Sequence, residues 1–164
     1  MSPLDRTIDS IDLQILHKLQ DNARETQAEI ARVVGLAPSA VLERIRKLEA
    51  RRVIQGYTAQ IDPAALGQGM LAFVAVRSTE GPNDDSVARQ LGELPEVLEV
   101  HHVAGDDCYL VKVRVQSPEH LGALLRNQIG TIPRVRSTRT TVVLETVKET
   151  SRLSIPRLVA EVPA

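Results

Sequence analysis

Between residues 71 and 144 the chain runs twice through the same order of elements: a strand, a short helix and a second strand. In the first pass, Leu71–Arg77 is a nearly continuous apolar run, Ser86–Leu94 places apolar residues at helical spacing, and Val97–Ala104 favours a strand. Few folds accommodate such a repeat, because each helix must bury its apolar side against the strands that flank it.

The second pass opens on Tyr109–Val115, where apolar residues alternate with Lys112 and Arg114. A helix that starts at Ser117 and Pro118 follows, and a strand over Val135–Leu144 completes the pattern. This half of the chain is therefore predicted to be an antiparallel sheet with both helices on one face. That is the ferredoxin-like (βαββαβ) arrangement of the α+β class.

The opposite face of this sheet has no predicted cover. The strands contribute apolar positions that include Leu98, Val100, Leu110 and Val142. Soluble proteins rarely expose a large apolar patch, so we expect a homodimer that buries part of this surface.

The first fifty residues indicate three helices, and the first two have clear start signals. Asp9 is placed to cap the first helix, whose buried stripe is Ile11, Ile15, Leu16 and Leu19. Thr26 and Glu29 have the spacing of a capping box for the second helix. Its predicted buried face is Ile30, Ala31, Val33 and Val34.

A turn at Gly35 separates the second helix from a third that Pro38 opens, since proline fits the first turn of a helix. The buried stripe of the third helix is Val41, Leu42, Ile45 and Leu48. This helix is basic: from Arg44 to Arg52 the chain has five Lys or Arg residues and one acid, Glu49. Two helices joined by a turn, with the second one basic, predict a helix-turn-helix that presents a recognition helix to the DNA major groove.

Side chains near the start of a recognition helix reach base edges, and cations farther along reach phosphates. Backbone N–H groups at the start of the preceding helix are further candidates for a phosphate. We therefore assign candidate DNA contacts to Thr26, Gln27, Ser39, Ala40, Glu43, Arg44, Lys47, Arg51 and Arg52. On spacing alone, a three-helix protein-interaction domain with a solvated basic flank is the alternative.

The segment Val53–Asp62 has the alternation of a short strand, broken at Gly56, and is expected to form a wing or a hinge. Pro63 and Gly67 then mark the start of a second domain. The expected organisation is a winged helix-turn-helix over residues 1–62, a ferredoxin-like effector and oligomerisation domain over 63–150, and a tail over 151–164.

The composition, 43% hydrophobic and 25% charged, is that of an ordinary soluble globular protein. The longest apolar run, Met70–Val76, is too short to cross a bilayer, and the N-terminus lacks a signal-peptide pattern. A single cysteine, Cys108, excludes an intrachain disulfide framework and suits a reducing compartment. We expect a cytoplasmic protein with no membrane partner.

No catalytic motif stands out, and neither an enzyme activity nor a cofactor is predicted. Cys108, His101 and His102 are the residue types that bind zinc. Adjacent histidines on a strand point to opposite faces, however, so at most one can lie beside the thiol. Ordinary sheet packing is the favoured interpretation, and no metal is expected.

Six stretches of the chain resemble the Lrp/AsnC family of feast/famine regulators. They are Ile11–Leu16, Val34–Ser39, Leu42–Glu49, Val53–Tyr57, Val103–Leu110 and Thr138–Thr140. The resemblance implies a DNA-binding transcription regulator that assembles as dimers and then as tetramers or octamers. It also implies an amino-acid effector that binds where dimers meet, beside the loop at Gly105.

The effector-site residues that the resemblance implies are His102, Gly105, Asp106, Asp107, Cys108, Tyr109, Thr138 and Thr140. The chain departs from the family pattern at Ala37, where serine is frequent, and at Asp107 and Cys108, where an aromatic residue and a second aspartate are usual. The change at Ala37 removes a side-chain cap, and the two changes in the loop alter the shape and the charge of the expected pocket.

Three other interpretations remain open at this point. The loop at Gly105 is also compatible with a plain hairpin connection that binds nothing. Sirohaem decarboxylases resemble this family in fold and would make the chain an enzyme. A stand-alone amino-acid-binding module is disfavoured, because the basic helix is intact.

Overall fold

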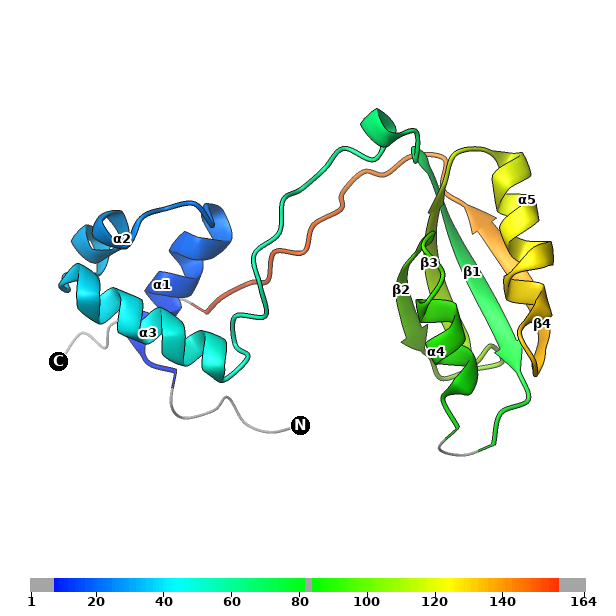
Figure 1. Cartoon of the computed structure of the whole chain (residues 1–164), viewed down its shortest axis with the longest axis horizontal. Coiled ribbons are helices and arrows are strands. Elements are labelled where there is room, and N and C mark those ends of the chain that lie inside the picture. Colours follow the sequence, from blue (N-terminus) through cyan, green and yellow to red (C-terminus); the bar gives the residue numbers. More distant parts are fainter. Residues whose placement is uncertain (1–7, 82–83, 157–164) are drawn as a thin grey trace, which may run out of the picture. The chain divides into compact units, whose positions relative to one another are not determined.

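The computed structural model describes residues 8–81 and 84–156, which form two compact units (Figure 1). The first unit takes in the chain up to Ala59 and again from Thr150, and the second spans Gln60–Glu149. Each unit has its own hydrophobic core. The chain therefore leaves the first unit once and returns to it near the C-terminal end.

The first unit contains the three predicted helices, α1 (Ser10–Asp21), α2 (Gln27–Val34) and α3 (Pro38–Ala50). Asp9 and Thr26 begin the first two with complete capping boxes, in which side chain and backbone N–H groups satisfy each other reciprocally. Ala37 begins α3 without a side-chain cap, as its methyl group requires.

The core of the first unit is small and draws on all three helices. Its buried residues are Ile15, Ile30, Ala31, Val41, Ile45 and Leu48. Val33 was predicted to share this core, but its side chain is 55% exposed. The prediction was wrong because the helical turn of α2 carries Val33 away from the stripe that Ile30, Ala31 and Val34 form.

Two backbone positions set the connections of α3. Gly35 has a φ of 70°, the left-handed conformation that ends α2. Arg52 has a φ of 56°, and the N–H of Val53 that follows it bonds to the carbonyl of Leu48. The strand predicted for residues 53–62 was not found: residues 53 and 54 form a bend, and residues 55–62 pair with no strand of the described chain.

The second unit is built on the strands β1 (Met70–Ser78), β2 (Val97–His102), β3 (Tyr109–Val115) and β4 (Val135–Val142). They pair antiparallel in the order β2-β3-β1-β4, which confirms the ferredoxin-like prediction. Short 3-10 turns lie at Ala64–Leu66 and Ile129–Thr131.

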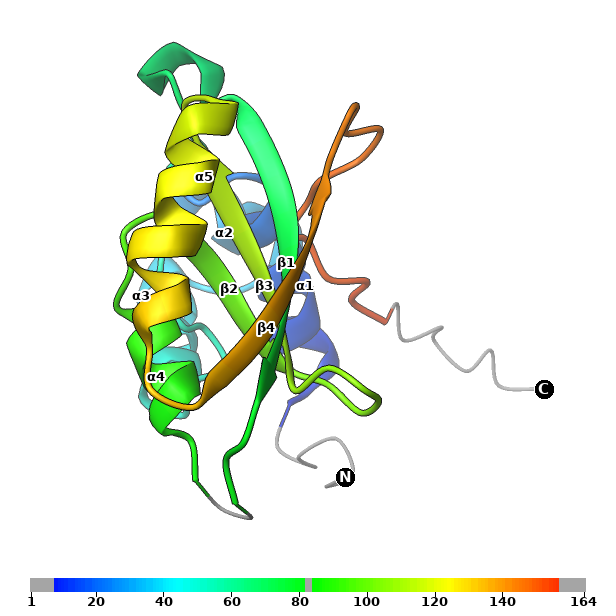
Figure 2. The same cartoon turned by 90° about the vertical axis from the view of Figure 1, so that its right-hand side faces the viewer.

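Helices α4 (Ser86–Gly92) and α5 (Pro118–Asn127) cover one face of the sheet (Figure 2). The strict alternation of β3 places Tyr109, Val111, Val113 and Val115 on that face, and all four side chains are buried. Val87 and Leu91 of α4 and Leu121 and Leu124 of α5 pack against this sheet face in the same core.

The opposite face was expected to be open, and this is corrected in part. Lys112 and Arg114 lie on it, opposite Phe73 and Leu71 of β1. Their side chains are only 13% and 12% exposed, and both form ion pairs with Glu149, at 2.5 and 2.7 Å. The segment after β4, which Figure 2 shows on the side away from the helices, therefore covers part of this face.

Candidate nucleic-acid interface and effector loop

The outward face of α3 is polar. Ser39, Glu43, Arg46 and Lys47 are exposed, whereas Ala40 is half-buried. Ser39, Glu43 and Arg46 follow one another at spacings of four and three residues, so they share one side of the helix. Arg46 was not among the predicted contacts, although its spacing from Ser39 and Glu43 was a usable signal. Within the described chain it makes no ion pair.

Arg44 lies on a different side of α3 and is held against α1. Its guanidinium is 2.7 Å from a carboxylate oxygen of Asp9 and 2.7 Å from one of Asp12. Asp12 is buried despite its charge, at 6% exposure. Burial raises the pKa of Asp9, but the N–H of Asp12 and the Arg44 guanidinium outweigh it and hold that pKa below its usual value. This placement suits a residue that fixes the helices to each other.

Two further predicted contacts are already engaged. Thr26 donates its backbone N–H to a carboxylate oxygen of Glu29 at 2.7 Å, so that N–H is occupied. Lys47 pairs with Glu43 one turn earlier at 2.6 Å, and both side chains are about two-thirds exposed. Gln27, Arg51 and Arg52 are exposed, Gln27 at the start of α2 and the two arginines at the end of α3.

A polar hollow of 330 Å³ lies where α3 meets the start of α1. It is lined by Asp9, Asp12, Ala40, Glu43, Arg44, Lys47, Leu48 and Arg51. Both carboxylates and cations are among the side chains that line it, so the hollow does not carry charge of a single sign. Five of the nine predicted DNA contacts line it, and two of these, Glu43 and Lys47, are also exposed on the outward face of α3.

The predicted effector loop, residues 103–108, joins β2 to β3 and is held by two arginines. Arg77 of β1 donates its Nε to the carbonyl oxygen of Asp106 at 2.9 Å. Arg139 of β4 contacts the Asp107 carboxylate at 2.6 Å, and its own side chain is 77% exposed. Neither arginine was predicted for the site. No local pattern marks them, because they come from other strands.

The strand register separates the remaining effector-site candidates. Thr138 and Thr140 lie opposite Val76 and Val74 of β1, in the row that faces the helices. Arg139 lies opposite Ala75, in the row of the other face. The loop carboxylate of Asp107 is thus joined to the Arg139 side of β4. The hydroxyl oxygen of Thr140 is buried and has no hydrogen-bond partner within the described chain.

Tyr109 anchors the base of the loop. Its ring lies 5.3 Å from that of His102, centroid to centroid, on the paired strand. Its hydroxyl donates to Glu80 at 2.7 Å, and burial together with this bond raises the pKa of Tyr109 to about 12.

The Glu80 carboxylate accepts several hydrogen bonds near the base of the loop. It also accepts hydrogen bonds from the Val87 N–H and from the hydroxyls of Ser78 and Ser86. Burial raises the pKa of Glu80, but these donors outweigh it and hold that pKa below its usual value.

Cys108 and Gly105 complete the loop. The Cys108 thiol is half-buried and lies 3.4 Å from the Ser78 nitrogen, so its neighbours are backbone groups of β1. Gly105 has a φ of 135°, which favours glycine at this position. Within residues 8–81 and 84–156, no three His, Cys, Asp or Glu side chains are grouped as metal ligands. The same residues contain no helix that is long and apolar enough to span a bilayer.

Comparison with known proteins bears on both units. The AsnC-type helix-turn-helix domain matches residues 8–49, and the Lrp/AsnC ligand binding domain matches residues 71–153. The chain belongs to the Lrp/AsnC family. This Lrp/AsnC protein is a DNA-binding transcriptional regulator, as the sequence predicted, and not an enzyme.

Curated relatives match the Lrp/AsnC protein over nearly its whole length. The HTH-type transcriptional regulator FL11 of Pyrococcus horikoshii is 43% identical and aligns over 90% of this chain and 97% of its own. The leucine-responsive regulatory protein of Escherichia coli is 39% identical over 92% of this chain and 93% of its own. These names do not support the sirohaem decarboxylase alternative.

Solved structures of regulators are also similar to this chain over nearly its whole length. A transcriptional regulator of Neisseria meningitidis in complex with L-Met has a TM-score of 0.85 at 27% identity, over 93% of this chain and all of its own. A feast or famine regulatory protein of Mycobacterium tuberculosis, complexed with L-methionine, has a TM-score of 0.84 at 39% identity, over 92% of this chain and all of its own.

Proposed function

We propose that this regulator recognises its operator through the outward face of α3. The observation that carries the proposal is the exposed stripe Ser39, Glu43 and Arg46, with Lys47 beside it. An arginine on this stripe can bond two acceptors of a guanine, and Lys47 can neutralise a phosphate. Arg44, tied to Asp9 and Asp12, sets the angle of the recognition helix instead.

Selection from a pool of random duplexes tests this proposal. We expect wild type to enrich an inverted repeat whose half-sites lie about one helical turn apart, roughly 10 base pairs. Lys47→Ala should then weaken binding to every sequence alike and lower the salt slope by about one. Enrichment of no sequence at all would contradict specific recognition.

The effector, in this proposal, is an amino acid bound at loop 103–108. Two solved relatives are complexes with L-methionine, which makes it the first ligand to test. The exposed Asp106 carboxylate is suited to a ligand ammonium, and the exposed Arg139 guanidinium to a ligand carboxylate. A ligand carboxylate at Arg139 would displace Asp107, so the loop would move when the site fills.

A thermal-shift screen with the twenty amino acids tests the effector proposal. A ligand at one hundred times its Kd should stabilise the native state by about 2.7 kcal/mol. Asp106→Ala should abolish the shift, while Glu93→Gln, an exposed acid after α4, should retain it. If all twenty amino acids leave the melting temperature unchanged at millimolar concentration, the effector belongs to another chemical class.

The proposed assembly is a homodimer through the sheet face that α4 and α5 leave free, with tetramers or octamers built from it. Apolar side chains are still exposed on β2 and in the segment after β4, including Leu98, Leu144 and Val147. Light scattering should give a dimer or a multiple of one, and Leu144→Asp should lower the mass. A monomer at micromolar wild-type concentration would exclude this assembly.

A further inference from the structure

Residues 152–156, the last that the structure describes, lie along α1 of the first unit. Asp21 forms an ion pair with Arg152, and Gln20 bonds to Leu153. His17 approaches the carbonyl oxygen of Ile155 at 3.3 Å. These partners run backward along α1 as the segment runs forward, so the segment crosses this helix antiparallel and in extended form.

The Gln20 contact is the most specific of these. Its side-chain amide donates to the Leu153 carbonyl at 2.8 Å and accepts from the Leu153 N–H at 2.9 Å. One side chain thus satisfies both main-chain groups of one residue, as a neighbouring strand would. Leu153 itself is 76% exposed, so this contact reads the backbone and not the side chain.

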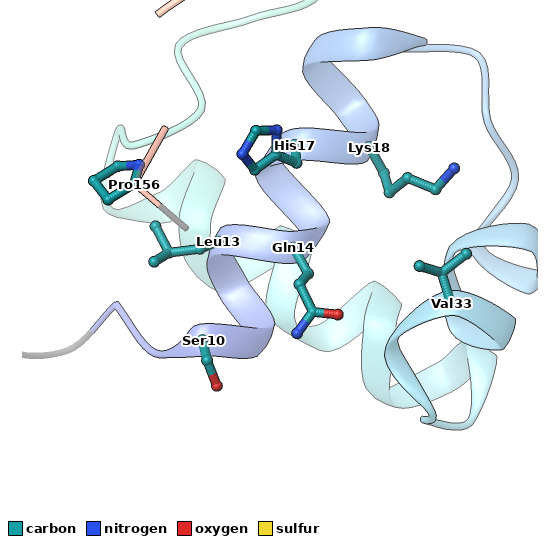
Figure 3. A pocket seen from close by; sticks show the side chains of 7 residues that line it. All are labelled: Ser10, Leu13, Gln14, His17, Lys18, Val33 and Pro156. Atoms are coloured by element: carbon teal, nitrogen blue, oxygen red, sulfur yellow. The ribbon is translucent and has the colours of Figure 1, made fainter. Parts of the chain in front are cut away.

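The described end of the segment borders a hollow of 370 Å³ on the same unit. Figure 3 shows Pro156 beside Leu13 and His17 of α1, with Lys18 and Val33 on the far side of the hollow. Pro156 has no N–H to satisfy and presents an apolar ring. The polar contacts at Gln20 and Asp21 are thus followed along the segment by a proline that lines the same hollow as Leu13.

We propose that residues 151–156 form a strap that binds the outer face of α1 of the same chain, with Gln20 as its main anchor. The covalent path leaves the first unit at Ala59 and returns at Thr150, so a bound strap ties the DNA-binding unit to the sheet unit at two points. Two ties restrict the unit more than one does. The strap therefore lowers the conformational entropy that a dimer loses when it binds two half-sites.

Hydrogen–deuterium exchange on the full chain tests the strap without any DNA. In wild type, the N–H of Leu153 should exchange more slowly than in an unstructured peptide of the same sequence. Gln20→Ala removes both bonds to Leu153 and should accelerate exchange over residues 151–156 by about tenfold. Gln14→Ala is the matched control, since the Gln14 side chain is exposed on the same helix and makes no hydrogen bond within the described chain.

Three outcomes overturn the strap. They are unstructured-peptide exchange in wild type, equal exchange in wild type and Gln20→Ala, and protection that disappears when a dimer is diluted to monomers. The last would mean that a second copy supplies the segment. Protection of Ile15 and Ile30 amides in each variant shows that the helical core is intact.

The consequence for DNA rests on the proposed operator recognition and has its own readout. Gln20→Ala and a chain ending at Thr150 should bind a paired site several-fold more weakly than wild type, but a single half-site equally well. Equal affinity for paired sites would remove the coupling role. The exchange result stands or falls separately, so the two failures are distinguishable.

Discussion

The two units place their candidate functional residues in opposite ways. On α3 the candidate contacts are exposed and local, since Ser39, Glu43 and Arg46 share a face through helical spacing alone. In the sheet unit the loop depends on partners 29 and 32 residues away, Arg77 and Arg139. A local surface keeps its structure when one side chain is removed, whereas the structure of a loop held by long-range contacts responds to changes on other strands.

The largest effect that sharpens this contrast is expected at Glu80, beneath the loop. Glu80→Gln keeps the size of the side chain but removes the charge that four donors approach. The sheet unit should lose about 2 kcal/mol of unfolding free energy. Chemical denaturation measures this loss, and Glu93→Gln serves as the exposed control.

The same carboxylate predicts a pH dependence. The pKa of Glu80 is lower in the folded chain than its ordinary value of 4.5. Its contribution to stability is therefore complete above that value and disappears as the pH falls through the folded-state pKa. Wild type and Glu80→Gln should converge in stability on acidification, and a difference that persists well below pH 4.5 would contradict this role.

The second largest effect is expected in the helical unit, where Arg44 ties α3 to α1. Arg44→Ala leaves the buried Asp12 without its cation, and because Arg44 is partly exposed we expect a loss of about 1 to 2 kcal/mol. Arg89→Ala removes an exposed pair with Asp85 and should cost no more than about 0.5 kcal/mol. Equal losses in the two variants would show that the Arg44 contacts have no special weight.

A gain of stability is expected at the start of α3. Ala37 begins this helix without a side-chain cap, and Ala37→Ser supplies a hydroxyl acceptor. The first unit should become more stable by about 1 kcal/mol in thermal or chemical unfolding. Ala50→Ser, in the last turn of the same helix, should give no gain.

The smallest effect on stability is expected at Arg139. Its pair with Asp107 is largely exposed, so Arg139→Ala should change the unfolding free energy by about 0.5 kcal/mol or less. The same variant should nevertheless lose amino-acid binding in calorimetry, because the proposed carboxylate partner is gone. Retained binding would move the effector site away from β4.

Features that depend on neighbouring residues were predictable from the sequence, and contacts between distant residues were not. Caps at Asp9 and Thr26 fix helix starts within a few residues, and the alternation of β3 gives its buried face directly. Arg44 was predicted to face DNA, because no pattern near it in the sequence indicates its partners Asp12 and Asp9, which lie 32 and 35 residues earlier.

The pairing of strands is the other feature that could not be predicted from the sequence. Thr138 and Thr140 were predicted beside the loop, but only the pairing register reveals that Arg139 is the β4 residue in contact with it. The strand predicted over 53–62 had the right alternation, and alternation alone supplies no partner strand.

The central claim is that α3 reads DNA with its outward stripe while Arg44 positions the helix. Fluorescence anisotropy on the selected duplex and on random DNA, across a salt series, tests this claim. The quantity to compare is the dissociation constant on random DNA divided by that on the selected duplex. Arg46→Ala should lower that ratio by about tenfold or more, as expected for a lost base contact worth about 1 to 3 kcal/mol. Arg44→Ala should weaken binding to both duplexes by the same factor and leave the ratio unchanged. A ratio that collapses in Arg44→Ala and survives in Arg46→Ala would contradict the account.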